Sequence, residues 1–241
     1  MKEKIKLFCI PYAGGSASVY KKWNLSLADN IELCPIELAG RGSRITEKYY
    51  ENLEEAVDDI FSQIVNDITT LDYAFFGHSM GAFLVYEVAQ KINALGLPMP
   101  KNIFFSGKKP PGTLQSTKRL SKMSSLEFEK NILALGRTPP ELFQYPELKK
   151  LFIPLLRSDF SLSETVVDRP EIIPFDTDIT VLLGDSEGVS PTVAVQWYAH
   201  TNKKCSIHFI EGGHFFIIDT PKVVINIINS TLIQQEKKAF V

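Results

Sequence analysis

The chain has 241 residues, of which 44% are hydrophobic, and it carries a formal net charge of −2 with an isoelectric point near 6.1. This length fits a single domain over residues 1–241 with enough apolar residues for a large core. The near-neutral charge gives no general attraction to nucleic acid or to an anionic membrane. No apolar stretch reaches membrane-spanning length, and the polar residues before the first expected strand are too few for a signal peptide.

The cysteines indicate a reducing compartment. Cys9, Cys34 and Cys205 lie in apolar, strand-like stretches and are odd in number. We therefore expect buried thiols and a cytoplasmic location, not a disulfide framework. No cluster of cysteine and histidine has the spacing of metal ligands, so we expect no metal site. We also expect no cofactor.

Strands and helices alternate along the chain. Strands are expected at residues 5–10, 31–38, 71–76, 102–106, 179–183 and 206–210, and helices at 51–69, from 79 onward, at 191–200 and at 221–233. This alternation predicts an α/β fold with a mostly parallel central sheet and helices on both faces.

The third expected strand leads into Gly77-His78-Ser79-Met80-Gly81. Apolar residues then recur with helical spacing. A Gly-x-Ser-x-Gly pentapeptide between a strand and a helix is typical of a nucleophile elbow. The sharp turn strains the serine backbone, and the two glycines avoid a collision with it. The pattern predicts that Ser79 is a nucleophile at the N-terminus of a helix, where developing negative charge is favoured.

A loop of small residues, 11–17, follows the first expected strand. It contains Gly14 and Gly15 but no Gly-Lys-Ser/Thr, so it is not a phosphate loop, and the sequence has no Gly-x-Gly-x-x-Gly fingerprint. In serine hydrolases of this layout, such a loop gives one backbone N–H to the oxyanion hole, and the residue after the serine gives the other. We expect the N–H groups of Ala13 and Met80 to be these donors.

The histidine of such a hydrolase follows the serine in sequence. His214 stands after the last expected strand, between two glycines and two phenylalanines, and is the predicted general base. The other histidines, His78, His200 and His208, are assigned structural roles.

The acid of the triad should follow the strand expected at residues 179–183. Asp185 and Glu187 both stand there, in the loop 184–188. Either carboxylate could hold the histidine in the required tautomer and stabilise its protonated form.

About seventy residues separate the strands expected at 102–106 and 179–183, far more than one crossover helix requires. The excess, residues 112–169, is apolar at helical spacing, and Pro139-Pro140 and Pro154 are expected to break it into short helices. It leaves the carboxyl end of a strand, which is the ligand side of an open α/β sheet. We expect a helical lid over the active site; a helical decoration on one sheet edge is the alternative.

Taken together, these motifs resemble the type II thioesterases, the stand-alone α/β-hydrolases that accompany polyketide synthases and non-ribosomal peptide synthetases. The resemblance runs nearly from end to end. It is carried by residues 11–17 (Pro-Phe-Ala-Gly-Gly-Ser-Ala in the family), 37–42 (Leu-Pro-Gly-Arg), 77–81 (the elbow), 106–111 (Ser-Gly-Arg-Arg-Ala-Pro), 136–140 (Gly-Gly-Thr-Pro), 156–160 (Leu-Arg-Ala-Asp-Phe) and 212–216 (the histidine motif). The elbow alone indicates only a hydrolase, whereas the lid and elbow motifs together are specific.

The sequence departs from the family at the acid. The family usually has Gly-x-x-Asp, with the last residue catalytic, and the matching position here is Glu187. The resemblance therefore favours Glu187, with Asp185 as the alternative.

The resemblance implies hydrolysis of acyl thioesters on the phosphopantetheine arm of an acyl or peptidyl carrier protein, which clears stalled or misprimed chains. The expected enzyme is a monomer. A surface that docks an acidic carrier protein is predicted from the basic residues Lys108, Lys109, Lys118, Arg119 and Lys122. Scattered solvated lysines are the alternative.

Two other functional classes stay open from the sequence. A carboxylesterase or lipase, or an acyl-CoA thioesterase, would use the same elbow. A non-catalytic binding module on a hydrolase scaffold would need neither Ser79 nor His214.

Overall fold

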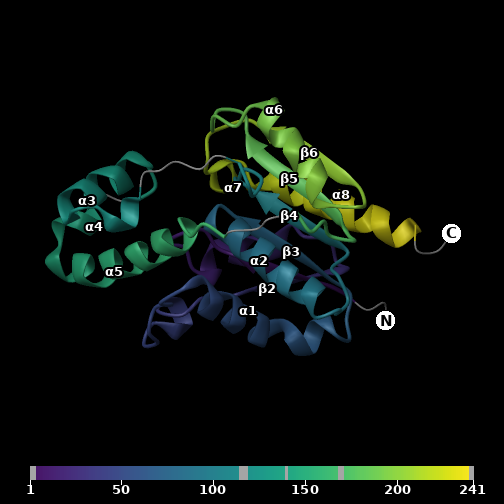
Figure 1. Cartoon of the computed structure of the whole chain (residues 1–241), viewed down its shortest axis with the longest axis horizontal. Coiled ribbons are helices and arrows are strands. Elements are labelled where there is room, and N and C mark those ends of the chain that lie inside the picture. The colour runs from purple at the N-terminus through teal and green to yellow at the C-terminus, as the bar shows by residue number, and fades with distance from the viewer. Residues whose placement is uncertain (1–3, 114–118, 139–140, 168–170, 239–241) are drawn as a thin grey trace.

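The computed structural model describes residues 4–113, 119–138, 141–167 and 171–238. One sheet of six strands has the order β2-β1-β3-β4-β5-β6, and every neighbouring pair is parallel. The strands are β1 (Ile5–Ile10), β2 (Ile31–Pro35), β3 (Tyr73–His78), β4 (Asn102–Ser106), β5 (Asp178–Gly184) and β6 (Cys205–Ile210). Helices flank the sheet on both sides (Figure 1), so the predicted fold class is confirmed.

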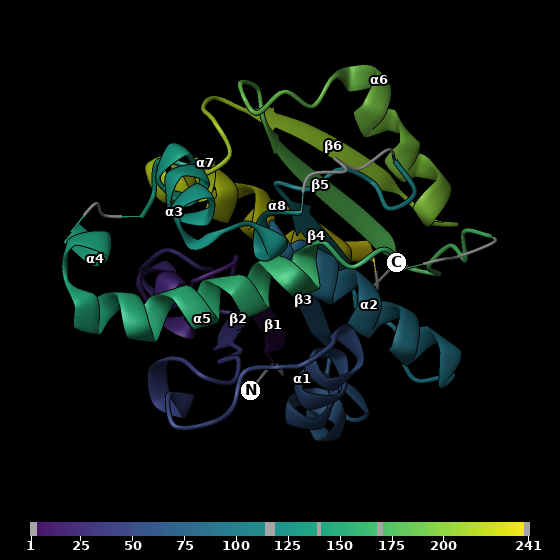
Figure 2. The same cartoon turned by 60° about the vertical axis from the view of Figure 1, so that its left-hand side comes forward.

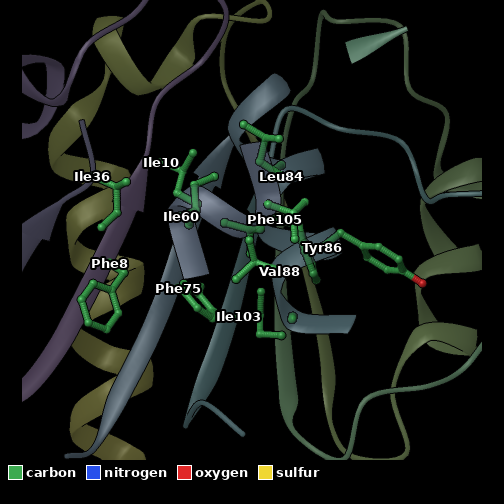
Figure 3. Packing of buried hydrophobic residues seen from close by; sticks show 14 of the residues in the cluster. Phe8, Ile10, Ile36, Ile60, Phe75, Leu84, Tyr86, Val88, Ile103 and Phe105 are labelled. Atoms are coloured by element: carbon green, nitrogen blue, oxygen red, sulfur yellow. The ribbon is translucent and has the colours of Figure 1, made fainter. Parts of the chain in front are cut away.

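Both faces of the sheet are buried. The helices α1 (Leu53–Ile68) and α2 (Met80–Ala94) pack on one face, where α2 side chains lie near Phe75 of β3 and Phe105 of β4 (Figure 3). The helix α8 (Pro221–Lys238) and the 3₁₀ helix η1 (Ala17–Leu25) pack on the other face, against Phe76 and Phe104. A strand that is covered on both faces has no face exposed to solvent, so it needs no alternation of polar and apolar residues. This explains the continuous apolar run of β3.

The 3₁₀ helix η3 (Leu120–Lys122) and the helices α3 (Ser125–Ala134), α4 (Glu141–Gln144) and α5 (Pro146–Ser163) lie between β4 and β5. We call this segment the insertion. Its helices form a group to one side of the sheet (Figure 1), and in the turned view α5 runs in front of the strands β1 and β3 (Figure 2). Their shared core is centred on Phe128, Ile132 and Leu156. The predicted breakers Pro139 and Pro140, and the predicted boundary at residue 169, lie outside the described residues.

The prediction that Pro154 breaks a helix is wrong, because α5 continues through it. A proline inside a helix costs about 3 kcal/mol, since it removes one hydrogen bond and crowds a carbonyl. Beyond the proline, α5 buries Leu155, Leu156 and Leu162. Burying one leucine contributes about 1.5–3 kcal/mol, so these three together outweigh that cost.

Only part of the predicted apolar stripe of the insertion is buried. The leucines that stay exposed are Leu126, Leu133, Leu135, Leu148 and Leu151. The remaining elements are the 3₁₀ helix η2 (Gly42–Arg44), the helix α6 (Pro191–Ala194) with the 3₁₀ helix η4 (Val195–His200), and the short helix α7 (Phe216–Asp219). In the part of the chain that the structure describes, no helix is both long and apolar enough to cross a membrane.

Candidate active site

Ser79 occupies the turn between β3 and α2. Its backbone has φ 56° and ψ −113°, and it is the only non-glycine residue with positive φ among those described. A Cβ on Gly77 would lie 2.3 Å from the carbonyl oxygen of Gly81, and a Cβ on Gly81 would lie 2.1 Å from that of Ile10. Both distances are too short for any side chain. The two glycines of the pentapeptide are therefore required by backbone packing around a strained serine.

Three side chains from different strand ends meet at this turn. Nε2 of His214 lies 3.0 Å from Oγ of Ser79, and its Nδ1 lies 3.0 Å from Oε2 of Glu187. Glu187 follows β5 and His214 follows β6, two neighbouring parallel strands whose carboxyl ends share one edge. The carboxylate side chain is only 3% exposed, whereas the imidazole is 38% exposed. The carboxylate is thus shielded from water, and the imidazole is open to a reacting molecule.

Asp185, the alternative acid, lies in a different place. Its Oδ1 accepts hydrogen bonds from the N–H of Gly212 at 3.1 Å and from the hydroxyl of Ser186 at 2.8 Å. It therefore joins the loop after β5 to the loop that carries His214, while Glu187 faces the imidazole.

The loop of residues 11–17 contains a tight turn beside the elbow. The N–H of Gly15 donates to the carbonyl oxygen of Tyr12 at 2.8 Å, so Ala13 and Gly14 are the central residues of this turn. Gly14 has φ +77°, which the third position of a type II turn requires. Met80 begins α2, and the first N–H groups of a helix have no partner within it.

The family model "Thioesterase domain" matches residues 5–232. This chain belongs to the thioesterase family. Linear gramicidin dehydrogenase LgrE of Brevibacillus parabrevis is 32% identical, with 95% of this chain and 88% of LgrE covered. Gramicidin S biosynthesis protein GrsT of Aneurinibacillus migulanus is 31% identical, with 90% and 84% covered. ClbQ from the colibactin NRPS/PKS pathway superposes with a TM-score of 0.90 at 34% identity, covering 97% of this chain and 99% of that one.

The protein is therefore a hydrolase that acts on thioesters, and the predicted resemblance to type II thioesterases is confirmed. LgrE is named a dehydrogenase, but the present sequence has no Gly-x-Gly-x-x-Gly dinucleotide fingerprint. Within the described residues, no group of three or more His, Cys, Asp and Glu side chains could hold a metal ion.

A second histidine of this thioesterase lies against the first. The ring of His78 is fully buried, its centroid is 5.0 Å from that of His214, and its Nδ1 is 2.9 Å from Oγ of Ser106. Burial, and then the charge of His214, lower the pKa of His78 well below its usual value of 6.5. A Cβ on Gly107 would lie 2.5 Å from the His78 ring. His78 is thus a neutral side chain that packs tightly behind the imidazole of His214.

The insertion of the thioesterase contacts the loop after β6. Arg137, in the turn that follows α3, pairs with Asp219 of α7, and its guanidinium lies 5.6 Å from the ring centroid of Phe215. Phe215 directly follows His214, so the insertion reaches the histidine side of the site. The insertion also contacts the turn at residues 12–15, through Asp159 of α5 and its partner Arg41. The sequence analysis gave neither residue a role.

Proposed function

We propose that this thioesterase removes acyl groups from the phosphopantetheine arm of an acyl or peptidyl carrier protein, and so releases stalled or misprimed chains. The observation that carries the proposal is the pair of 3.0 Å contacts that link Ser79, His214 and Glu187 in a chain of this family. The pathways named for GrsT and ClbQ, which are gramicidin S and colibactin biosynthesis, support a carrier-protein substrate.

In the proposed reaction, Oγ of Ser79 attacks the thioester carbonyl while Nε2 of His214 takes its proton. Collapse of the tetrahedral intermediate breaks the C–S bond, and the imidazolium gives that proton to the departing sulfur. Water then attacks the acyl-serine, gives one proton to His214 and releases the free acid, and His214 returns the proton to the serine. Glu187 accepts the Nδ1–H bond and stabilises the imidazolium in both steps.

The oxyanion of the intermediate is proposed to lie between the N–H groups of Ala13 and Met80. Met80 offers a first-turn helix donor next to the nucleophile, and Ala13 lies in the turn beside the elbow. A thiol with a pKa of about 8.5 leaves readily, so stabilisation of the oxyanion contributes more than acid assistance.

We further propose that the insertion, residues 112–169, is a lid and that its start receives the carrier protein. Of the predicted docking residues, Lys109, Arg119 and Lys122 are exposed, and Lys118 lies outside the described residues. The prediction of Lys108 as a surface docking residue is not supported, because its ammonium group lies 5.3 Å from the ring centroid of Phe83. The free cysteines support a reducing, cytoplasmic setting.

Mass spectrometry of an acyl-loaded carrier protein tests the proposal. Wild type should remove the acyl mass, and Ser79→Ala should leave it in place. Arg119→Glu/Lys122→Glu should raise KM for the carrier substrate and leave a small acyl thioester unaffected. If the carrier stays loaded while an oxygen ester or acyl-CoA is cleaved, the carrier-protein partner is wrong and an esterase or acyl-CoA thioesterase takes its place.

A further inference from the structure

Asp159 of α5 is a fully buried carboxylate outside the triad. Its Oδ2 accepts the N–H of Gly14 at 2.7 Å, and its two oxygens accept Nη1 and Nη2 of Arg41, each at 2.6 Å. Arg41 is 4% exposed and also donates from Nη1 to the carbonyl oxygen of Gly15 at 3.2 Å. One buried ion pair thus connects the insertion to two consecutive residues of the turn beside the elbow.

A second contact joins the same helix to the same turn. A Cβ on Gly14 would lie 2.7 Å from a methyl group of Leu156, which precedes Asp159 on α5 by almost one helical turn. The glycine therefore allows α5 to approach the turn closely, and the hydrogen bond of Asp159 fixes the orientation of the Ala13–Gly14 peptide there.

The choice of residues favours a role in geometry over a role in stability. An apolar pair of similar volume is often as stabilising as a buried ion pair, because desolvation of two charges offsets their attraction. An apolar residue at position 159, however, would leave the N–H of Gly14 without its acceptor. The carboxylate of Asp159 therefore supplies the acceptor that the N–H of Gly14 requires.

We propose that Asp159, held by Arg41, is a positioning residue that orients the turn of residues 12–15 so that the N–H of Ala13 points at the oxyanion. The placement of α5 is then coupled to the competence of the oxyanion hole. This inference rests on the proposed roles of Ser79 and Ala13.

Two double variants isolate the hydrogen bond to Gly14. Arg41→Met/Asp159→Asn and Arg41→Met/Asp159→Leu both remove the ion pair without leaving a buried charge, but only the first keeps an acceptor oxygen. Hydrolysis of an acyl-N-acetylcysteamine thioester requires no carrier protein and gives kcat and KM. Binding of an alkylboronic acid, which forms a tetrahedral adduct on the serine, reports the oxyanion hole directly.

The Leu double variant should have a kcat about 10- to 100-fold below that of the Asn double variant, with similar KM, and its affinity for the boronic acid should fall by the same factor. Ser158→Ala is the matched control. It removes another bond of α5, from Oγ to the carbonyl oxygen of Tyr50 at 3.0 Å, and should leave kcat unchanged.

The inference would be overturned if the two double variants, both folded at the assay temperature, had equal kcat and equal affinity for the boronic acid. Asp159 would then have only a structural role. Should the Leu double variant not fold, Arg41→Lys tests the other half of the inference, that Arg41 holds the carboxylate of Asp159 in place. It loses the paired contact, and kcat should fall several-fold at constant KM; an unchanged kcat would overturn the inference. Activity retained by Ser79→Ala would instead refute the proposed mechanism, so the two failures are distinguishable.

Discussion

Lys108 carries a charge that folding does not favour. The residue is half-buried after β4, its ammonium group lies over the ring of Phe83, and burial lowers its pKa to about 8 from the usual 10.5. We predict that Lys108→Met makes the folded protein more stable at pH 7, because methionine fills the same space without a charge to desolvate.

The magnitude follows from the pKa shift. A fall from 10.5 to about 8 corresponds to about 3.5 kcal/mol at ~1.4 kcal/mol per unit. The cation–π contact with Phe83 offsets about 1 kcal/mol of this, and the partial exposure of the residue reduces it further, so we expect a gain of roughly 1–2 kcal/mol. Because the folded-state pKa is the lower one, the unfolded chain binds the extra proton between pH 8 and 10.5. The penalty is therefore complete below pH 8 and disappears as the pH rises through this window.

Urea unfolding followed by fluorescence measures the effect at pH 7 and at pH 10. Lys108→Met should have the higher midpoint at pH 7, and the difference from wild type should shrink at pH 10. Lys109→Met is the matched control, because the neighbouring lysine is exposed, and its midpoint should equal that of wild type. A Lys108→Met variant that is no more stable at pH 7, or a gain that is the same at both pH values, would refute the reasoning.

The loop carboxylates, one glycine and the buried histidine give separate tests. Glu187→Gln should lower kcat roughly 10²- to 10⁴-fold in thioester hydrolysis because the amide does not hold the required tautomer, whereas Asp185→Asn keeps an acceptor for the loop and should leave kcat nearly unchanged. Equal losses would contradict this assignment. Gly14→Ala should lower kcat and cost about 1–3 kcal/mol in thermal unfolding, because φ is +77° and the new Cβ would lie 2.7 Å from a side chain of α5; a stable, fully active variant would refute it. Since the pKa of His78 is lowered, the unfolded chain binds a proton below pH 6.5 that the folded protein does not bind. The free energy of unfolding should therefore decrease as the pH is lowered below 6.5. His78→Asn should flatten that slope in urea unfolding, and an unaltered slope would assign it to other groups.

Features that depend on local sequence were predictable. The bounds of β1 and β4 agree with the prediction residue for residue, since short apolar runs ending in turn residues leave little choice. The elbow was equally clear, because the strained turn at Ser79 requires glycine two residues before and two after it. The order of serine, acid and histidine then limited the partners to the loops after the last two strands.

Features that depend on long-range packing were not predictable. Arg41 and Asp159 are separated by 118 positions, and an arginine and an aspartate are usually exposed, so nothing local marks them as a buried pair. Pro154 was misread because local propensity ends a helix where tertiary burial continues it. Lys108 was assigned to the surface for the same reason, since its burial over Phe83 depends on α2.

The insertion is tied to the two sides of the site by contacts of different strength. On the side of the turn at residues 12–15, Asp159 and Arg41 are 0% and 4% exposed, so water and salt hardly weaken their attraction. On the histidine side, Arg137 and Asp219 are 35% and 49% exposed, and such pairs contribute little in water and are screened by salt. A displacement of the insertion would therefore begin beside Phe215 and leave α5 attached at Gly14. The turn at residues 12–15 would keep its support, while the histidine side would open toward an incoming acyl chain.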